Sequence, residues 1–275
     1  MSFVEEHYGH HAGLSAAEYV QRHVRGSPVQ MARIRDTVAL IPPEARSVLD
    51  VGAGYGVLLE ELKAARGVAG IGVEIAPSKV DYAQARGVDL RLGSAERLTV
   101  ADKSFDAVLA CEVIEHLPFQ VYERALAELA RVARHAVLVS VPNEEQRSFV
   151  RCPYCGASVN PSYHFRSFSP ASLNGLFPGF RLAATAGLGS HRSSPLLRAG
   201  LRWVDAGWPA SLVCACCGYR AAPAAARPGS AAEAPARPVR AWARRLSLLV
   251  PARRKPTWLV GVYLADGTAA KDAGG

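Results

Sequence analysis

Residues 47–56 read SVLDVGAGYG, and this stretch decides the fold. The run Ser47–Val51 is short, mostly apolar and rich in valine, which is typical of a buried strand. The glycine-rich stretch Gly52–Gly56 follows at once, and Val57–Arg66 then has the apolar spacing of a helix that ends at Gly67. The sequence therefore predicts a strand, a tight glycine loop and a helix.

Strands and helices continue to alternate along the chain. This order favours an α/β fold in which a parallel sheet is covered by helices on both faces. Two helices over 14–40, separated at Ser27 and Pro28, come before the first strand. Further strands are expected at 68–74, 88–92, 105–111, 135–141, 180–186 and 258–264, and further helices at 77–86, 119–133 and 169–176.

The glycine loop is suited to close contact with a ligand. Glycine lets a ligand approach the backbone and the amides at a helix start, and ligands of such sheets bind at the carboxyl ends of the strands. A dinucleotide-binding loop, G-x-G-x-x-G counted from Gly52, would need a third glycine where the chain has Val57. The spacing therefore disfavours a nicotinamide dinucleotide.

Two motifs carry a resemblance to a known family. Asp50, Gly52, Gly54 and Gly56 form the pattern D-x-G-x-G-x-G, and residues 105–117 read FDAVLACEVIEHL. Over roughly 46–143 the chain resembles class I S-adenosylmethionine-dependent methyltransferases of the ubiquinone-biosynthesis-like branch. The resemblance implies a Rossmann-like sheet, mostly parallel with an antiparallel last strand.

The resemblance also implies a site for the methyl donor S-adenosylmethionine. Glu74 would accept hydrogen bonds from both ribose hydroxyls, Ile75 would pack on the adenine, and the turn at 94–96 would lie beside it. Taken singly, Glu74 reads as a cap of the next helix and Glu96 as a solvated turn residue, but their register with the loop favours donor binding. The expected cofactor-binding residues are Asp50, Gly52, Gly54, Gly56, Glu74, Ile75, Ser94, Ala95, Glu96 and Cys111.

Two cysteine motifs predict a metal site. Residues 152–156 read CPYCG and residues 214–218 read CACCG, so each pair has a glycine directly after its second cysteine. Such a glycine allows the positive φ that turns backbone amides towards thiolate sulfurs, and four thiolates complete a closed tetrahedral shell. We expect structural zinc held by Cys152, Cys155, Cys214 and Cys217. The alternatives are unligated or redox-active cysteines, or a ligand supplied by Cys216 or His164.

The two cysteine motifs follow the fifth and sixth strands. Both therefore leave the sheet at the carboxyl edge, which is the edge expected to hold the donor. We expect zinc to join two long loops into a small cap above the methyl acceptor. Metal removal should then weaken acceptor binding more than donor binding.

Methyl transfer from a sulfonium is an in-line displacement, so positioning and exclusion of water supply much of the catalysis. A base is needed only for a weakly acidic hydroxyl. His116 follows the fourth strand, near the expected donor methyl, and is the candidate catalytic base. A histidine that only shapes the pocket or caps the next helix is an equal alternative. Asn143 and His164-Phe165-Arg166 enter the same edge and are further acceptor-side candidates.

The sequence predicts a methyltransferase that acts on a small-molecule, glycan or lipid-linked acceptor, at oxygen. One alternative is an RNA or protein methyltransferase that grips a macromolecule with zinc knuckles and arginines. The net charge of +8 permits an anionic partner, but few aromatic residues lie among the arginines, which argues against nucleic acid. A second alternative is a non-catalytic module that binds the donor or its demethylated product.

Composition predicts a globular cytoplasmic protein. Of the 275 residues 49% are hydrophobic, no basic and apolar signal opens the chain, and no apolar run reaches the roughly 18 residues of a membrane span. Residues 239–255 mix Trp, Leu and Arg, which permits peripheral membrane contact, although a helix covering the sheet is preferred. The oligomeric state is not indicated.

The expected organisation has five parts. They are N-terminal helices (1–42), a cofactor-binding core (43–143), an acceptor-side region with the zinc knuckles, a helix and the sixth strand (144–220), a flexible Ala/Pro/Arg linker (221–240), and a C-terminal helix with the final strand (241–275).

Overall fold

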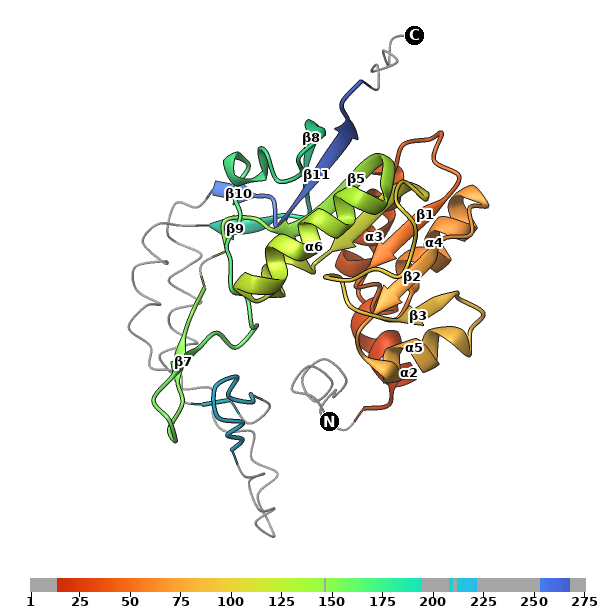
Figure 1. The fold of residues 1–275 in the computed structure, drawn as a ribbon. Coiled ribbons are helices and arrows are strands. Elements are labelled where there is room, and N and C mark those ends of the chain that lie inside the picture. Colours follow the sequence, from red (N-terminus) through yellow and green to blue (C-terminus); the bar gives the residue numbers. More distant parts are fainter. Residues whose placement is uncertain (1–13, 146, 194–207, 210–211, 222–252, 268–275) are drawn as a thin grey trace. The chain divides into compact units, whose positions relative to one another are not determined.

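The computed structural model of the protein describes residues 14–145, 147–193, 208–209, 212–221 and 253–267. The chain divides into two compact units, and each is discontinuous in sequence (Figure 1). The sheet unit comprises Met1–Glu145, His164–Gly189 and Pro256–Gly275, and the knuckle unit comprises Gln146–Tyr163 and Ser190–Lys255. The predicted linker at 221–240, almost all of the predicted C-terminal helix and the tail beyond 267 lie outside the described residues.

The sheet unit is built on seven strands in the order β3-β2-β1-β4-β5-β11-β8. β11 runs antiparallel to β5 and β8, while the pairs among β1 to β5 are parallel. This confirms the predicted fold class. The strands are β1 (Val48–Val51), β2 (Ile71–Glu74), β3 (Leu90–Leu92), β4 (Phe105–Cys111), β5 (Ala133–Pro142), β8 (Phe180–Leu188) and β11 (Trp258–Ala265).

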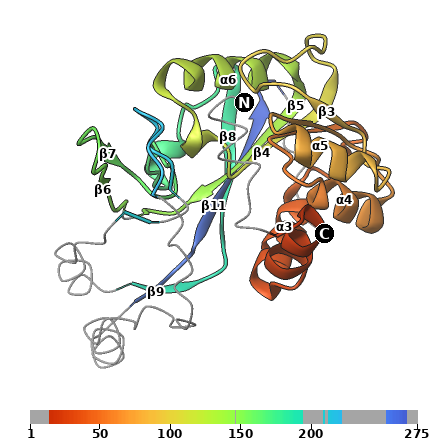
Figure 2. The same ribbon diagram turned by 90° about the horizontal axis from the view of Figure 1, so that it is seen from below.

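Helices cover both faces of this sheet (Figure 2). Ser27 caps α3 by accepting a hydrogen bond from Gln30 N, and Gly67 closes α4 at φ 67°, as the sequence predicts. α3 and α4 pack on one face and α6 on the other. The helices and helical turns are α2 (Ala16–Tyr19), η1 (Val20–Arg25), α3 (Pro28–Leu40), α4 (Val57–Arg66), α5 (Pro77–Gln84), η2 (Ile114–His116), α6 (Phe119–Val132) and η3 (Ala171–Leu173).

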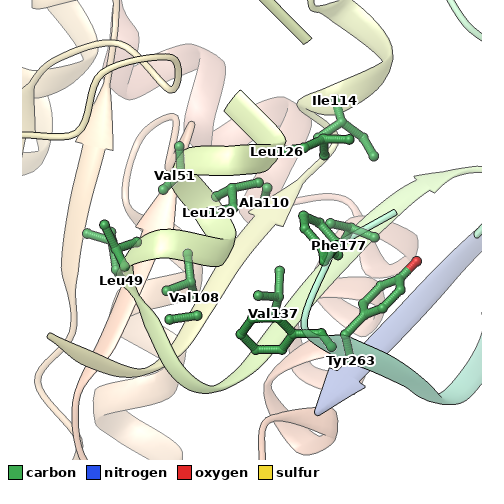
Figure 3. Packing of buried hydrophobic residues seen from close by; sticks show 14 of the residues in the cluster. Leu49, Val51, Val108, Ala110, Ile114, Leu126, Leu129, Val137, Phe177 and Tyr263 are labelled. Carbon is green, nitrogen blue, oxygen red and sulfur yellow. The ribbon is translucent and has the colours of Figure 1, made fainter. Parts of the chain in front are cut away.

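The central strands are buried on both sides, which explains their continuous apolar runs. Figure 3 shows the α6 face, where Leu126 and Leu129 of α6 meet Val108, Val137 and the other labelled residues of the sheet. Each such fully buried side chain contributes about 1.5–3 kcal/mol to folding. The result is a rigid sheet from whose carboxyl ends the functional loops project.

The helix predicted over 169–176 is wrong. The structure has only the three-residue turn η3 there. Ser169 and Ser172 form the reciprocal bonds that cap a helix start, but Gly175 adopts φ 71°, which a right-handed helix cannot continue through. The turn is nevertheless anchored, because the Tyr263 hydroxyl donates a hydrogen bond to Leu173 O at 2.6 Å.

The knuckle unit contains two short antiparallel pairs that the sequence did not predict. β6 (Val150–Arg151) pairs with β7 (Ser158–Val159), and β9 (His191–Ser193) pairs with β10 (Arg253–Lys255). A small core of its own surrounds Tyr163, whose hydroxyl donates to Val213 O at 2.6 Å and accepts from Val213 N at 2.9 Å. This bond ties the two chain segments of the unit together.

Candidate functional site

The glycine loop after β1 needs its glycines for two different reasons. Gly52, Gly54 and Gly56 all have positive φ, at 75°, 58° and 74°. A Cβ on Gly52 would also stand 2.4 Å from a methyl group of Val113, whereas a Cβ on Gly54 would meet nothing within 4 Å. The backbone is therefore closed in at Gly52 and open at Gly54, where a ligand could approach.

Glu74, at the carboxyl end of β2, holds this loop. Its Oε2 accepts a hydrogen bond from Gly54 N at 2.8 Å, and its Oε1 accepts from Ile75 N and Ala76 N at 2.9 and 3.0 Å. The carboxylate thus joins the loop to the start of α5 and is itself buried. Its expected bonds to ribose hydroxyls stay a prediction. The alternative drawn from the sequence is a cap of α5, but Glu74 accepts from amides that lie before the helix, and α5 has no side-chain cap bond.

Asp50 lies on β1 directly before the loop. Burial raises the pKa of its carboxyl to about 7, and the negative charge of Glu74 acts in the same direction. A cationic group bound beside Asp50 would stabilise the ionised carboxylate and lower its pKa again, so Asp50 is suited to binding such a group.

Two segments, Ile75 after β2 and the turn at 94–96, are expected to contact the adenine of the donor. Ile75 is 43% exposed, so its side chain is accessible to a flat apolar ring. Ser94 and Arg97 form an isolated bridge that closes the turn containing Ala95. Glu96 forms an ion pair with Arg124 of α6, so its side chain is engaged at the surface.

A network that sequence reasoning missed lies at the end of β4. Glu112 follows half-buried Cys111 and has φ 58°, a conformation that non-glycine residues seldom adopt and that is often kept at functional sites. Its Oε1 accepts from Ser140 Oγ at 2.9 Å and lies 3.9 Å from Arg33 of α3. Desolvation raises the pKa of Glu112, and the Arg33 charge opposes this. The unusual φ depends on the fold and leaves no signal in the sequence.

Glu115, His116 and His164 form a second group, which we call the acid–imidazole cluster. Their ligand atoms all lie within 4.8 Å of one another, and the imidazole rings of His116 and His164 meet edge to face at 4.5 Å. The turn η2 presents Glu115 and His116, and Phe165 N donates to Glu115 O at 2.8 Å, which holds the segment of His164 against η2. The fold therefore brings together two histidines that the sequence offered separately.

Glu115 is the member of this cluster that most strongly indicates a bound cation. It is 1% exposed, and among the described residues neither of its carboxylate oxygens has a hydrogen-bond partner in another residue. Burial raises its pKa well above the usual value, and the charge of Glu112 adds to this. An uncompensated buried carboxylate is costly, so a cation or a bound proton has to offset its charge. One carboxylate and two imidazoles are a donor set that fits a divalent metal ion.

The other acceptor-side candidates lie nearby in the sheet unit. Asn143 is buried; its side-chain amide donates to Pro256 O at 3.0 Å, and its Oδ1 has no partner among the described residues. Arg166 donates to Leu117 O, and its guanidinium lies 3.7 Å from the ring centroid of Tyr122. Burial lowers the pKa of Arg166.

The four predicted zinc ligands come together in the knuckle unit, as the thiol cluster. Cys152, Cys155, Cys214 and Cys217 place their sulfurs within 4.8 Å of one another, without Cys216 or His164. The two turns are alike, since Gly156 N bonds to Cys152 O at 2.9 Å and Gly218 N to Cys214 O at 2.8 Å. Both glycines have positive φ, at 74° and 73°. Four converging thiols fit a tetrahedral zinc ion.

The sheet order, the glycine loop after β1 and the acid that ends β2 define a class I S-adenosylmethionine-dependent methyltransferase domain. The sequence profile of the family described as "Methyltransferase domain" matches residues 49–140, which span β1 to β5. The chain therefore carries a domain of this family, as its motifs predict.

Curated relatives support the same branch. The chain is 33% identical over 139 residues to a ubiquinone biosynthesis O-methyltransferase of Azorhizobium caulinodans, covering 45% of this chain and 54% of that protein. It is 38% identical over 108 residues to the protein of that name from Methylobacterium nodulans, covering 34% and 43%. The chain thus matches about half the length of these relatives.

A solved structure supports the fold alone. The chain is similar to a methyltransferase from Archaeoglobus fulgidus, whose title describes it as dependent on S-adenosylmethionine, with a TM-score of 0.54 and 17% identity over 90% of this chain and 99% of that one. In the part of the chain that the structure describes, every helix is too short or too polar to cross a membrane.

Proposed function

We propose that this protein transfers a methyl group from S-adenosylmethionine to an oxygen of a small-molecule, glycan or lipid-linked acceptor. The observation that supports donor binding is the hydrogen bond from Gly54 N to Glu74 Oε2. It places an open stretch of backbone beside a buried acid at the carboxyl edge of the sheet. The names of the curated relatives supply the preference for oxygen.

The proposed donor site consists of the ten residues predicted from the sequence. Glycine-loop amides and Asp50 would face the methionine portion of the donor, since an acid with a raised pKa gains most from a nearby ammonium group. Ile75 would lie against the adenine, because it is exposed in this structure. Arg33 and Glu112 are added to these ten, because Arg33 of α3 lies 3.9 Å from Glu112 and its charge also acts on Asp50.

Calorimetry on the full chain tests the donor site. We expect S-adenosylmethionine and its demethylated product to bind to the wild type, and Ile75→Ser to weaken that binding several-fold by removing apolar contact. Val29→Ser, which removes an apolar side chain of α3 that is 57% exposed, is the control and should leave binding unchanged. Well-folded wild type that binds neither compound would exclude the proposed function.

A screen of hydroxylated acceptors then tests the transfer itself. Release of demethylated donor is measured with phenols, sugars and hydroxylated lipids. Turnover with any of them supports the enzyme, and the position of the new methyl group decides whether oxygen is attacked. Donor binding without turnover on any acceptor would favour the non-catalytic module.

We propose further that the acid–imidazole cluster takes part in this reaction as a cation site. Glu115, His116 and His164 would hold the ion, and a divalent ion supplies positive charge that favours ionisation of an acceptor hydroxyl. The buried, uncompensated carboxylate of Glu115 supports this assignment. His116 would then act as a ligand, which replaces the predicted role as the general base.

The thiol cluster is proposed to bind structural zinc. Four thiolates leave no coordination position open for substrate, so this ion would stabilise the fold of the knuckle unit. The expectation that the knuckles cap the acceptor stays a prediction. It is tested by comparing acceptor KM and donor Kd before and after zinc removal, and an equal effect on both would contradict it.

A further inference from the structure

Glu145 makes a contact that the proposed function leaves unused. Its Oε2 is hydrogen bonded to Nδ1 of His164, whose side chain is only 12% exposed. We propose that Glu145 is a positioning residue, which fixes His164 as a cation ligand through its other ring nitrogen. This inference rests on the proposed cation site.

The chemistry of imidazole gives this contact its meaning. A carboxylate accepts a proton, so the Nδ1 that faces it carries the hydrogen, and the lone pair then lies on Nε2. A histidine that ligates a metal commonly donates its other N–H to a carboxylate, which sets the tautomer and the ring orientation. The contact between Glu145 and His164 is of this kind.

The backbone holds Glu145 in place for the task. Asn143 N bonds to Thr257 O at 3.0 Å, and Glu144 N bonds to Phe168 O at 2.7 Å. Ser167 Oγ donates to Glu145 O at 3.0 Å. The first bond attaches the end of β5 to the start of β11, and the other two attach Glu144 and Glu145 to the segment that carries His164, so the carboxylate approaches the ring from a fixed side.

The neighbours of His164 in the acid–imidazole cluster point to the same conclusion. The His164 ring meets His116 edge to face, and the two histidines and Glu115 have their ligand atoms within 4.8 Å of one another. Glu112, Glu115 and Glu145 add three carboxylates to this region, and the charge of Glu145 is one cause of the raised pKa of Glu115. Because Glu145 is already engaged with His164, it acts through that residue.

Binding of Mn²⁺ to the purified full chain tests the proposal. This ion prefers oxygen and imidazole ligands to thiolates, so it discriminates against the thiol cluster. We expect Glu145→Ala to weaken Mn²⁺ binding about tenfold to hundredfold. Glu145→Gln should restore binding to within about threefold of wild type, because its amide oxygen can still accept the Nδ1 proton. Glu144→Gln removes the same charge from the exposed neighbouring residue and should have no effect.

Each other outcome overturns a different step. If Glu145→Gln binds Mn²⁺ as weakly as Glu145→Ala, Glu145 is itself a ligand. If Glu145→Ala binds like the wild type while His164→Ala does not, His164 is oriented by other groups. If the wild type binds no Mn²⁺, the cation site and the positioning role both fall, whereas donor binding in the same samples leaves the methyltransferase proposal standing. Unchanged donor affinity also shows that the variants are folded.

Discussion

The two clusters of side chains that could hold a metal ion differ in how the chain assembles them. The thiol cluster consists of two pairs, and each pair is held by its own short turn. The acid–imidazole cluster joins η2 to a segment beyond β5 that only the completed sheet brings near it. Ligands that are close in sequence can be recognised from spacing, whereas ligands that the fold brings together cannot.

The clusters differ equally in chemistry. Four soft thiolates and a closed shell suit a zinc ion that stays in place. A carboxylate and two imidazoles suit a harder ion with positions left for substrate. If this contrast is correct, the two sites should respond differently to the same treatments.

The largest effect is expected from the thiol cluster. Cys155→Ser should reduce zinc from about one ion per chain to almost none and unfold the knuckle unit, because structural zinc contributes on the order of 10 kcal/mol to such folds. Cys216→Ser, next to the cluster but outside it, should keep its zinc. Metal analysis and thermal unfolding measure both variants. Equal zinc in the two would contradict the assignment.

The next effect concerns the buried acid of the other cluster. Glu115→Gln should weaken Mn²⁺ binding by about a hundredfold or more, since a neutral amide is a poor ligand for a divalent ion. In chelator at neutral pH, however, the variant should be more stable than wild type by about 1–3 kcal/mol, because folding of the wild type has to protonate the buried carboxyl and the amide needs no proton. Denaturant unfolding with and without Mn²⁺ measures this. A less stable variant under both conditions would mean that Glu115 has another partner.

Asp50, a buried carboxyl outside both clusters, should make the free energy of unfolding depend on pH, which adds a test without metal to the comparison. The pKa of Asp50 is about 7 in the folded protein and 3.8, its ordinary value, in the unfolded chain. Between these two values the folded protein keeps the Asp50 carboxyl protonated while the unfolded chain does not. Stability is thereby lost as pH rises from about 4 to 7 and then levels off. Asp50→Asn avoids this loss, and its advantage over wild type should grow by about 2 kcal/mol between pH 5 and 7. Chemical denaturation at both pH values, in chelator, provides the measurement, and an advantage independent of pH would contradict the shift.

The smallest effect is expected at the surface. The ion pair of Glu96 with Arg124 is largely solvated, with side-chain exposures of 31% and 57%. Arg124→Ala should therefore cost only about 0.2–1 kcal/mol, less at high salt. A larger loss, or a tenfold loss of donor affinity, would show that the pair holds the adenine turn.

Much of the sheet unit could be predicted because its signals are local. The valines of β1, the glycines after it and the cap at Gly67 each act within a few residues. The helix predicted at 169–176 has its cap at Ser169 and Ser172 but stops after one turn, because Gly175 takes a positive φ that apolar spacing does not reveal. The β9–β10 pair could not be predicted, because its strands are short and far apart in sequence.

The site shows the same division. The glycine loop and Glu74 follow from a motif, and the cysteines follow from their spacing. The roles of Arg33, Glu112 and Glu145 depend on contacts with residues distant along the chain, and a positive φ at Glu112 leaves no trace in the residue type. Side chains whose function depends on a partner elsewhere in the fold were therefore missed.

If the thiol cluster binds zinc as proposed, the path of the chain between the cysteine pairs has a consequence for biosynthesis. The first pair leaves the ribosome well before the second, and β8 is made between them. A metal ion bound early by Cys152 and Cys155 would have only two of its four ligands until Cys214 and Cys217 have left the ribosome. Completion of the site then closes a ring of chain that contains β8, which limits the freedom of that edge strand in partly folded states. Zinc supply during synthesis would in this way influence how often the last part of the sheet is correctly paired.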